Sequence, residues 1–202
     1  VGSEMCIRDR ISPGQKVLDL AGGTGDLTGR LARAAGSEGL VVLAEINDTM
    51  LRRAQLRFAD GDSPGQVEYV RANAEEVPFR DNRFDVVTIA FGIRNVTHKE
   101  AVLHAMFRVL RPGGTAVVLE FSRPTVPGFG PLYDFYSFQV MPLIGRLVAG
   151  KDGGFRYLAE SIRVHPDQET FLTMMEEAGF EGCEYHDLSG GIVAVHRGFK
   201  PQ

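Results

Sequence analysis

The sequence predicts an α/β domain with a mostly parallel sheet of seven strands, helices on both faces and an antiparallel edge strand. From Lys16 onward, apolar runs of strand length alternate with segments of helical periodicity, as in a parallel sheet covered on both sides. A glycine-rich turn follows the first run, and the last two runs, 183–189 and 192–199, lie only two residues apart. So short a connection predicts a hairpin, whose strands run in opposite directions.

The strands are placed on short apolar runs bounded by glycine, proline and polar residues. They are expected at 16–21, 40–46, 67–72, 84–92, 115–121, 183–189 and 192–199. Helical segments separate most of these runs, which favours parallel strands joined by crossover connections.

The helices are placed by their periodicity and by residues that begin or end a helix. They are expected at 26–35, 48–58, 97–110 and 167–178. Gly36 ends the first helix and Asp48 is the candidate N-cap of the second. Thr97 and Glu100 form a T-x-x-E capping box for the third helix, which the segment R-P-G-G at 111–114 then stops.

Composition limits the class of protein. The chain has 202 residues, of which 44% are hydrophobic and 24% charged, which is ordinary for one globular domain with a substantial core. Its formal net charge of -4 argues against nucleic-acid binding, since such binding needs a basic surface. The two cysteines are too few for a disulfide framework, and no apolar run approaches the roughly 18 residues of a spanning helix. A cytoplasmic location is therefore expected.

One domain is expected over residues 11–202. Residues 1–10, VGSEMCIRDR, show neither strand alternation nor helical periodicity and resemble a translated sequencing adapter. We therefore expect a non-native or disordered tail, with the native N-terminus and its cover over the ligand site missing. Residues 122–156 interrupt the alternation with proline, glycine and aromatic residues, and we interpret them as an insertion on the substrate side of the sheet.

The segment VLDLAGGTGDLT at 17–28 predicts a ligand site, because glycines let the backbone approach a bound molecule closely. A phosphate-binding P-loop is excluded, since no lysine follows the glycines. A dinucleotide fingerprint is incomplete, because Thr28 stands where its third glycine belongs, although Glu45 would suit the ribose of NAD. The arrangement D-x-x-G-G-T-G at 19–25 also suits S-adenosylmethionine, which carries no phosphate. A tight turn without a ligand is the remaining interpretation.

The ends of the neighbouring strands favour S-adenosylmethionine. Glu45 ends the second strand, where a carboxylate can accept both ribose hydroxyls. Asn73 and Ala74 follow the third strand, where an amide can reach an adenine edge. Parallel strands bring these positions to one crevice at their carboxyl ends. The segment V-L-R-P-G-G at 109–114, between a helix and a strand, is common in methyltransferases.

Longer motifs carry a more specific resemblance. VLDLAGGTGDLT, NAEEVPF, FGIRNV, RVLRPGG, LEFSRP and RYLAESIRVHPDQ occur in this order, and together they resemble the UbiE-type C-methyltransferases of quinone biosynthesis. The similarity covers residues 14–200. It implies a Rossmann-like class I methyltransferase fold and S-adenosyl-L-methionine as the cofactor. It also implies methylation of a ring carbon of demethylmenaquinol, of 2-methoxy-6-polyprenyl-1,4-benzoquinol, or of both.

The resemblance also implies the site residues. The cofactor positions are Gly23, Thr24, Gly25, Glu45, Asn73, Ala74 and Ala90, and the catalytic pair is Arg94 and Asn95. Family members often have Asp at the Glu45 position and Ser at the Ala90 position, so a side-chain contact at Ala90 is not expected here. Because an arginine side chain stays protonated in proteins, we expect Arg94 to stabilise the quinol phenolate and orient the water that takes its proton. The alternative is that Arg94 pairs with a surface acid.

Four further residues are candidates for substrate contact: Tyr133, Tyr136, Arg163 and His165. Residues 129–157 hold seven aromatic side chains, which predict either a helix packed on the sheet or an apolar channel that meets the inner face of the membrane. His165 precedes Pro166 at a helix start, so capping or packing is the alternative there. No compact cluster of histidine, cysteine and carboxylate is evident, and no metal is expected.

Three other functions remain open from the sequence. The chain could be another small-molecule methyltransferase, acting on a sterol or a phenolic oxygen. It could be a nicotinamide-dependent reductase that uses Glu45 for the ribose, or a catalytically idle cofactor-binding scaffold. The expected partners are a polyprenyl quinol and, transiently, the membrane surface. A homodimer or a quinone-synthesis assembly is also open, and no nucleic acid is expected.

Overall fold

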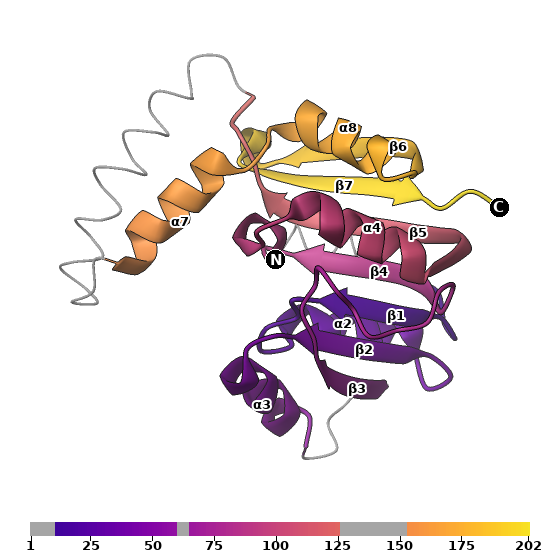
Figure 1. Ribbon diagram of the computed structural model, residues 1–202. Helices are drawn as coiled ribbons and strands as arrows, with labels where there is room; N and C mark the ends of the chain where they lie inside the picture. The colour runs from indigo at the N-terminus through magenta and orange to yellow at the C-terminus, as the bar shows by residue number, and fades with distance from the viewer. Residues whose placement is uncertain (1–10, 60–64, 126–152) are drawn as a thin grey trace.

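Seven strands form a single sheet in the order β3-β2-β1-β4-β5-β7-β6, and helices pack on both of its faces (Figure 1). The computed structural model describes residues 11–59, 65–125 and 153–202. The strands are β1 (Lys16–Leu20), β2 (Leu40–Glu45), β3 (Gln66–Arg71), β4 (Phe84–Ala90), β5 (Leu110–Phe121), β6 (Glu181–Leu188) and β7 (Val193–Phe199). The helices are α2 (Asp26–Ala35), α3 (Asp48–Arg57), α4 (Lys99–Val109), α7 (Gly153–Val164) and α8 (Gln168–Glu177), with short 3₁₀ turns η1 (Ile93–Asn95) and η3 (Ser189–Gly191). The predicted fold class is confirmed.

The strand order reverses at β1, and this reversal creates the place for a ligand. β1 lies between β2 and β4 and is parallel to both. The chain first moves outward through β2 to β3 and then returns to β4 on the other side of β1. The connections that leave β1 and β4 therefore diverge, and open α/β sheets bind ligands in the crevice that such a divergence leaves at the carboxyl ends of the strands.

The predicted hairpin joins β6 to β7. β7 pairs antiparallel with β5 on one side and with β6 on the other, so the reversed strand lies one position inside the edge of the sheet. The connection is η3, in which Gly190 and Gly191 have φ angles of 71° and 89°. Glycine adopts these left-handed angles without the steric cost that a Cβ atom would add, which explains the glycine pair at this turn.

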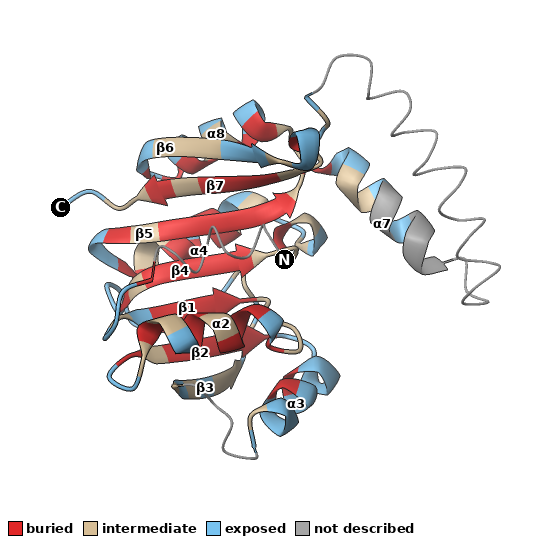
Figure 2. Cartoon of the chain, turned by 180° about the vertical axis from the view of Figure 1, so that it is seen from behind, coloured by how far each residue is buried: buried red, intermediate tan, exposed pale blue. Residues whose placement is uncertain are grey.

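Alternate residues of the central strands pack against helices on opposite faces. Leu18 and Leu20 of β1 belong to the core that includes Leu103 of α4 and Phe171 of α8, all fully buried. Val17 belongs instead to the core under α2. Figure 2 shows the resulting band of buried residues along the middle strands. Burial on both faces explains why these strands are apolar runs without polar alternation.

Helix α3 begins one residue earlier than expected from its cap. The N-cap is Asn47, whose side-chain oxygen accepts hydrogen bonds from the backbone N–H groups of Thr49 (2.9 Å) and Met50 (3.2 Å). The expected cap, Asp48, is the first helical residue. A negative charge there is still favourable, because the first turn of a helix carries partial positive charge.

The capping box expected at Thr97 and Glu100 is wrong. α4 takes His98 as its N-cap and has no side-chain hydrogen bond at that position. Instead Glu75, from the connection after β3, accepts hydrogen bonds from the backbone N–H groups of Thr97 (2.8 Å) and His98 (3.1 Å). A distant carboxylate therefore replaces the local cap and ties the end of β3 to the start of α4.

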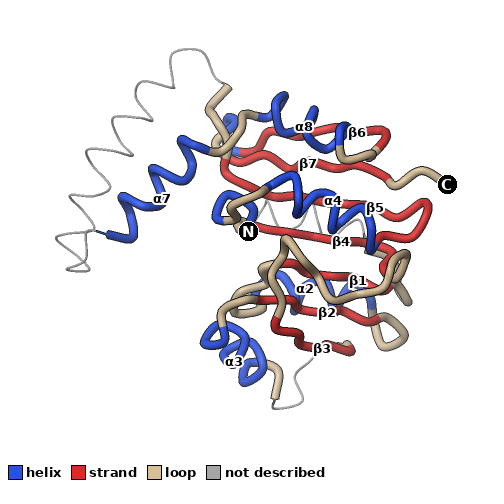
Figure 3. Tube along the Cα trace, in the orientation of Figure 1, coloured by secondary structure: helices blue, strands red, loops and turns tan. Residues whose placement is uncertain are grey.

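Helix α7 is not predicted by the sequence pattern. It lies beyond the carboxyl ends of the parallel strands, and only residues 165–167 separate it from α8 (Figure 3). Asp167 begins α8 as its N-cap and accepts from the backbone N–H of Thr170 (2.9 Å).

Residues 1–10 and most of the predicted insertion, 126–152, lie outside the described residues. In the part of the chain that the structure describes, no helix combines the length and apolar character needed to cross a bilayer.

Candidate functional site

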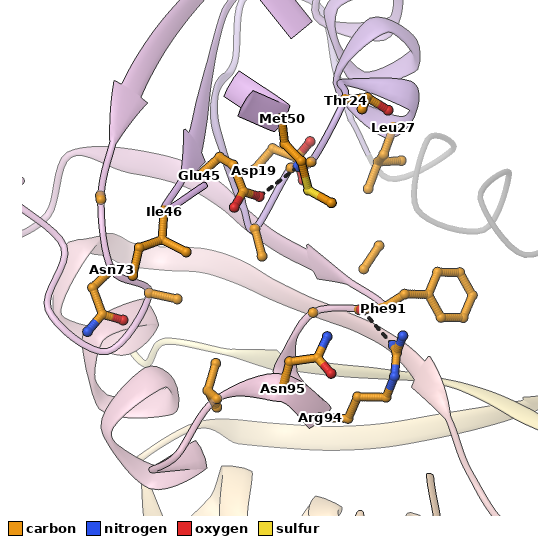
Figure 4. A pocket seen from close by; sticks show the side chains of 18 of the residues that line it. Asp19, Thr24, Leu27, Glu45, Ile46, Met50, Asn73, Phe91, Arg94 and Asn95 are labelled. Carbon is orange, nitrogen blue, oxygen red and sulfur yellow. Dashed lines mark hydrogen bonds between the residues drawn. The ribbon is translucent and has the colours of Figure 1, made fainter. Parts of the chain in front are cut away.

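A cavity of about 750 Å³ lies at the carboxyl ends of β1, β2, β3 and β4, which we call the strand-tip cavity (Figure 4). Its volume suits a ligand of nucleoside size. Eight of the predicted site residues line it: Gly23, Thr24, Glu45, Asn73, Ala74, Ala90, Arg94 and Asn95. The fold thus brings the predicted cofactor residues of four strand ends together with the predicted catalytic pair of η1.

The glycine turn packs directly on β2. The backbone N–H of Gly22 donates to the carbonyl oxygen of Ala44 (3.3 Å), and a Cβ atom at Gly22 would lie only 2.7 Å from Cγ of Leu43. Position 22 is therefore restricted to glycine by its contact with the neighbouring strand. Gly23 lines the cavity, and a Cβ atom there would have no neighbour within 4 Å. Its backbone is open to a ligand.

Gly25 does not line the strand-tip cavity. It is the N-cap of α2 with a φ angle of 84°, and its N–H donates to the carbonyl oxygen of Gly22 (2.9 Å). A Cβ atom at Gly25 would lie 2.8 Å from the ring of Phe58, which packs against it from the end of α3. The structure therefore gives Gly25 a role in the shape of the turn and in the packing of α2 on α3.

Glu45 connects the tip of β2 to the glycine turn. The residue is 6% exposed, and its Oε2 accepts from the backbone N–H of Gly23 (3.0 Å) while Oε1 accepts from that of Asn47 (2.8 Å). Each carboxylate oxygen has more than one lone pair. Glu45 can therefore hold the turn in place and still accept hydrogen bonds from a ligand in the cavity.

Asp19 also lines the cavity, although it is not among the predicted site residues. Its side chain is buried on β1 and accepts hydrogen bonds from the hydroxyls of Thr28 (2.6 Å) and Thr88 (3.0 Å). Burial raises the pKa of this carboxyl to about 6, the two hydroxyls lower it, and the charge of Glu45 raises it. The available signal was an acidic residue inside an otherwise apolar strand.

Asn73 and Ala74 line the cavity where the chain leaves β3. The side-chain oxygen of Asn73 accepts from the backbone N–H of Glu75 (3.1 Å), so the amide nitrogen of Asn73 points away from that N–H group. Glu75 in turn holds the start of α4, as described above. Ala90 lines the cavity at the end of β4, where it offers backbone atoms and a methyl group, but no side-chain hydrogen bond.

Arg94 pairs with a buried acid, Glu120, at the end of β5. Nη1 of Arg94 lies 2.7 Å from Oε1 of Glu120, and the two side chains are 12% and 2% exposed. The same nitrogen donates to the carbonyl oxygen of Phe91 (2.6 Å; Figure 4). The partner of Arg94 is thus not the surface acid of the alternative interpretation, and Arg94 itself remains part of the cavity lining.

Asn95 is held from outside the cavity by Tyr157 of α7. The Tyr157 hydroxyl donates to the side-chain oxygen of Asn95 (3.0 Å). An amide whose oxygen accepts this bond has its nitrogen free to donate in another direction. Figure 4 shows Asn95 next to Arg94 on the same side of the cavity.

The model of the ubiE/COQ5 methyltransferase family matches residues 4–200 of the chain. The chain belongs to this family. Within it, the ubiquinone/menaquinone biosynthesis C-methyltransferase UbiE of Ectopseudomonas mendocina is 58% identical over 191 residues, which cover 95% of this chain and 75% of the relative.

The fold of this ubiE/COQ5 family member is shared with solved methyltransferases of low sequence identity. A SAM-dependent methyltransferase from Aquifex aeolicus aligns with a TM-score of 0.72 at 16% identity, over 98% of this chain and 88% of that one. The phosphoethanolamine N-methyltransferase 2 of Haemonchus contortus, solved with S-adenosyl-L-methionine, aligns with a TM-score of 0.74 at 15% identity, over 100% of this chain and 53% of that one.

The four candidates for substrate contact in this family member lie apart from the strand-tip cavity or outside the described residues. His165 is 3% exposed, and its ring lies 5.4 Å from that of Phe171. Burial lowers its pKa to about 3, with smaller contributions from nearby positive charges, so the ring stays neutral and packs as an apolar group. Arg163 is exposed near the end of α7. Tyr133 and Tyr136 lie outside the described residues.

Large apolar residues outside the predicted set also line the cavity, among them Ile46, Met50 and Phe91. Ile46 is 58% exposed and Met50 43%, so both offer apolar surface that an apolar face of a ligand could cover. Their signal in the sequence was their position, directly after a strand end or in the helix turn that follows. Among the described residues, no three His, Cys, Asp or Glu side chains gather into a group that could hold a metal ion.

Proposed function

We propose that this chain transfers the methyl group of S-adenosyl-L-methionine to a ring carbon of a polyprenyl quinol, as an enzyme of ubiquinone and menaquinone biosynthesis. The observation that carries the proposal is the 58% identity to a curated UbiE over 95% of the chain. It agrees with the family model and with the position of the cavity at the strand tips. We propose the quinols demethylmenaquinol and 2-methoxy-6-polyprenyl-1,4-benzoquinol as the substrates.

The cavity residues fit S-adenosyl-L-methionine. Gly22 and Gly23 bring bare backbone to the cavity, and Glu45 retains acceptor capacity for ribose hydroxyls. Asn73 and Ala74 would hold the adenine, and Gly23 with Thr24 the amino-acid part. Ala90 would contribute backbone alone. When bound, the cofactor supplies an electrophilic methyl group on a sulfonium.

The chemistry requires an electron-rich ring carbon. When a quinol hydroxyl loses its proton, negative charge spreads to the adjacent carbon, and this carbon forms the new bond to the methyl group while the methyl–sulfur bond breaks. The ring carbon then loses its own proton and the ring becomes aromatic again. We assign to Arg94 the stabilisation of the phenolate and the orientation of the water that accepts the hydroxyl proton, because a guanidinium does not act as a base near neutral pH. Asn95 would fix both groups.

A purified chain with methyl-labelled cofactor tests the proposal directly. We expect label on a ring carbon of each quinol, and no label on a sterol or on a phenolic oxygen. We also expect S-adenosylhomocysteine, but not NADH, to raise the melting temperature, since a ligand that binds only the folded state stabilises it. Label on oxygen, or stabilisation by NADH alone, would contradict the proposal.

Membrane contact and assembly are part of the proposal. A polyprenyl quinol resides in the bilayer, so we propose that the aromatic residues of 129–157 lead it to the cavity from a peripheral position at the inner membrane face. We also propose that a homodimer, or an assembly with other quinone-synthesis enzymes, would lengthen the time that the chain spends at the membrane. Flotation with liposomes of bacterial lipids tests the contact, and complete absence of bound protein would count against it.

A further inference from the structure

Glu120 holds both ends of Arg94 with one carboxylate. Its Oε1 accepts from Nη1 of Arg94 (2.7 Å), and its Oε2 accepts from the backbone N–H of the same residue (3.2 Å). Oε1 also accepts from the backbone N–H of Phe121 (2.8 Å), so the carboxylate is fixed to its own strand. The orientation of Arg94 is therefore set at its backbone and at its guanidinium by a single group.

The geometry of this pair favours orientation over strength. The strongest arginine–carboxylate pairs are bidentate, with two guanidinium nitrogens on two carboxylate oxygens. Here Oε2 is used by the backbone instead, and among the described residues Nε of Arg94 is buried without a hydrogen-bond partner. The guanidinium also lies over the ring of Phe121, 5.2 Å from its centre, in a cation–π contact that favours this orientation.

Stability alone does not account for a charge at this position. A buried ion pair contributes little net stability, and well-packed apolar residues often replace one without loss. Glu120 is 2% exposed and does not line the cavity, so a ligand there does not reach it. Burial raises the pKa of Glu120 and the charge of Arg94 lowers it, as expected when a carboxylate is kept in the interior by one cation.

We propose that Glu120 is a positioning residue of the methyl transfer: it holds the Arg94 guanidinium at the cavity wall in the orientation that stabilises the quinol phenolate. This inference rests on the proposed function and goes beyond it. The residue acts through Arg94 and touches neither substrate nor cofactor. Because small displacements of a catalytic group cost rate, loss of Glu120 is expected to affect turnover more than binding.

The variants Glu120→Gln and Glu120→Asp test the proposal. Glu120→Gln keeps the size but removes the charge, so we expect kcat to fall about 100-fold while the dissociation constant for S-adenosylhomocysteine changes less than about threefold. Glu120→Asp keeps the charge on a shorter side chain, and we expect it to recover part of kcat. The matched control is Asp85→Asn, which breaks the ion pair of Asp85 on β4 with Arg111 on β5 (2.7 Å), away from the cavity.

The outcomes separate this inference from the proposed function. A folded Glu120→Gln that binds S-adenosylhomocysteine and keeps kcat within twofold of wild type overturns the positioning role, as does an equal loss of kcat in Asp85→Asn. If Glu120→Gln does not fold, the kcat of Glu120→Asp is compared with that of Asp85→Asn instead. A loss of kcat in Glu120→Asp alone supports the positioning role, and equal kcat values in the two variants overturn it. If the wild type methylates neither quinol, the proposed function fails. The guanidinium NMR signal of Arg94, identified by its absence in Arg94→Lys, then decides: an unchanged signal in Glu120→Asp overturns the proposal, and a broadened or shifted one supports it.

Discussion

The backbone N–H of Gly23 donates to Oε2 of Glu45 over 3.0 Å, which joins the turn after β1 to the last residue of β2. The same carboxylate accepts from Asn47 at the start of α3. One side chain thus orders the ends of two neighbouring strands and the entry to a helix. These are three of the surfaces around the strand-tip cavity.

Glu45→Gln is expected to weaken cofactor binding. The amide nitrogen cannot accept a hydrogen bond, so the variant loses either a backbone contact or an acceptor for the ribose hydroxyls. Hydrogen bonds to a charged group contribute about 1.5–3 kcal/mol, so we expect S-adenosylhomocysteine to bind about 10- to 100-fold more weakly by isothermal titration calorimetry. Glu68→Gln, at an exposed position on β3, is the control and should bind as wild type does. Equal affinities for all three proteins would contradict the role of Glu45.

Arg94→Ala is expected to abolish most turnover and leave cofactor affinity nearly unchanged. We expect kcat to fall at least about 100-fold, because the phenolate loses its cationic neighbour. The variant also leaves the buried Glu120 without its partner, which costs about 3–5 kcal/mol of folding stability, so melting temperature must be measured alongside. Arg111→Ala, which removes an exposed arginine from its ion pair with Asp85, serves as the control. A fully active Arg94→Ala would end the assignment.

Tyr157→Phe tests the link between α7 and Asn95. The variant removes only the hydroxyl that donates to Asn95, and Tyr157 is 56% exposed, so folding stability should change by less than about 0.5 kcal/mol. We expect kcat for the quinol to fall several-fold with no change in S-adenosylhomocysteine binding. The control is Tyr185→Phe, which removes a hydroxyl that donates to Glu169 and not to Asn95. It should not alter kcat. If the two variants behave alike, Tyr157 does not orient Asn95.

Asp19 is expected to make folding stability depend on pH. Its pKa is about 6 in the folded protein against 3.8 for the ordinary carboxyl, so between these values the folded state holds a proton that the unfolded state has released. The contribution of Asp19 to stability is therefore fully present below about pH 4 and is lost as the pH rises through 6, a change of about 3 kcal/mol. Asp19→Asn should remove this dependence.

Urea denaturation at pH 4 and pH 7 measures this effect. Wild type should lose stability relative to Asp19→Asn between the two values, and the threonine hydroxyls beside position 19 can accept from the amide that replaces the acid. Asp81→Asn, at an exposed carboxylate, is the control for general charge effects. A wild type and an Asp19→Asn variant with parallel pH profiles would show that the carboxyl titrates normally.

Much of the fold was predictable from local pattern. The strand runs, the glycine turn and the short connection before β7 depend on residues near one another in the sequence, and the structure confirms them. The helix starts were less predictable. Asn47 and Asp48 can both cap a helix, and Thr97 with Glu100 satisfies a capping pattern that the structure does not use. A capping pattern cannot show that Glu75 already accepts from the backbone N–H of Thr97, which the Glu100 side chain would use in a capping box.

The sequence alone determined that Glu45, Asn73 and Arg94 stand at or just after the ends of strands, and all three line the cavity. Only the tertiary structure decided their partners: Glu120 reaches Arg94 across 26 positions of sequence, and Tyr157 reaches Asn95 across 62. The reason is physical. Periodicity reports whether a side chain faces the core or a helix, while a hydrogen bond between distant residues depends on strand register and helix placement, which no short stretch of sequence contains.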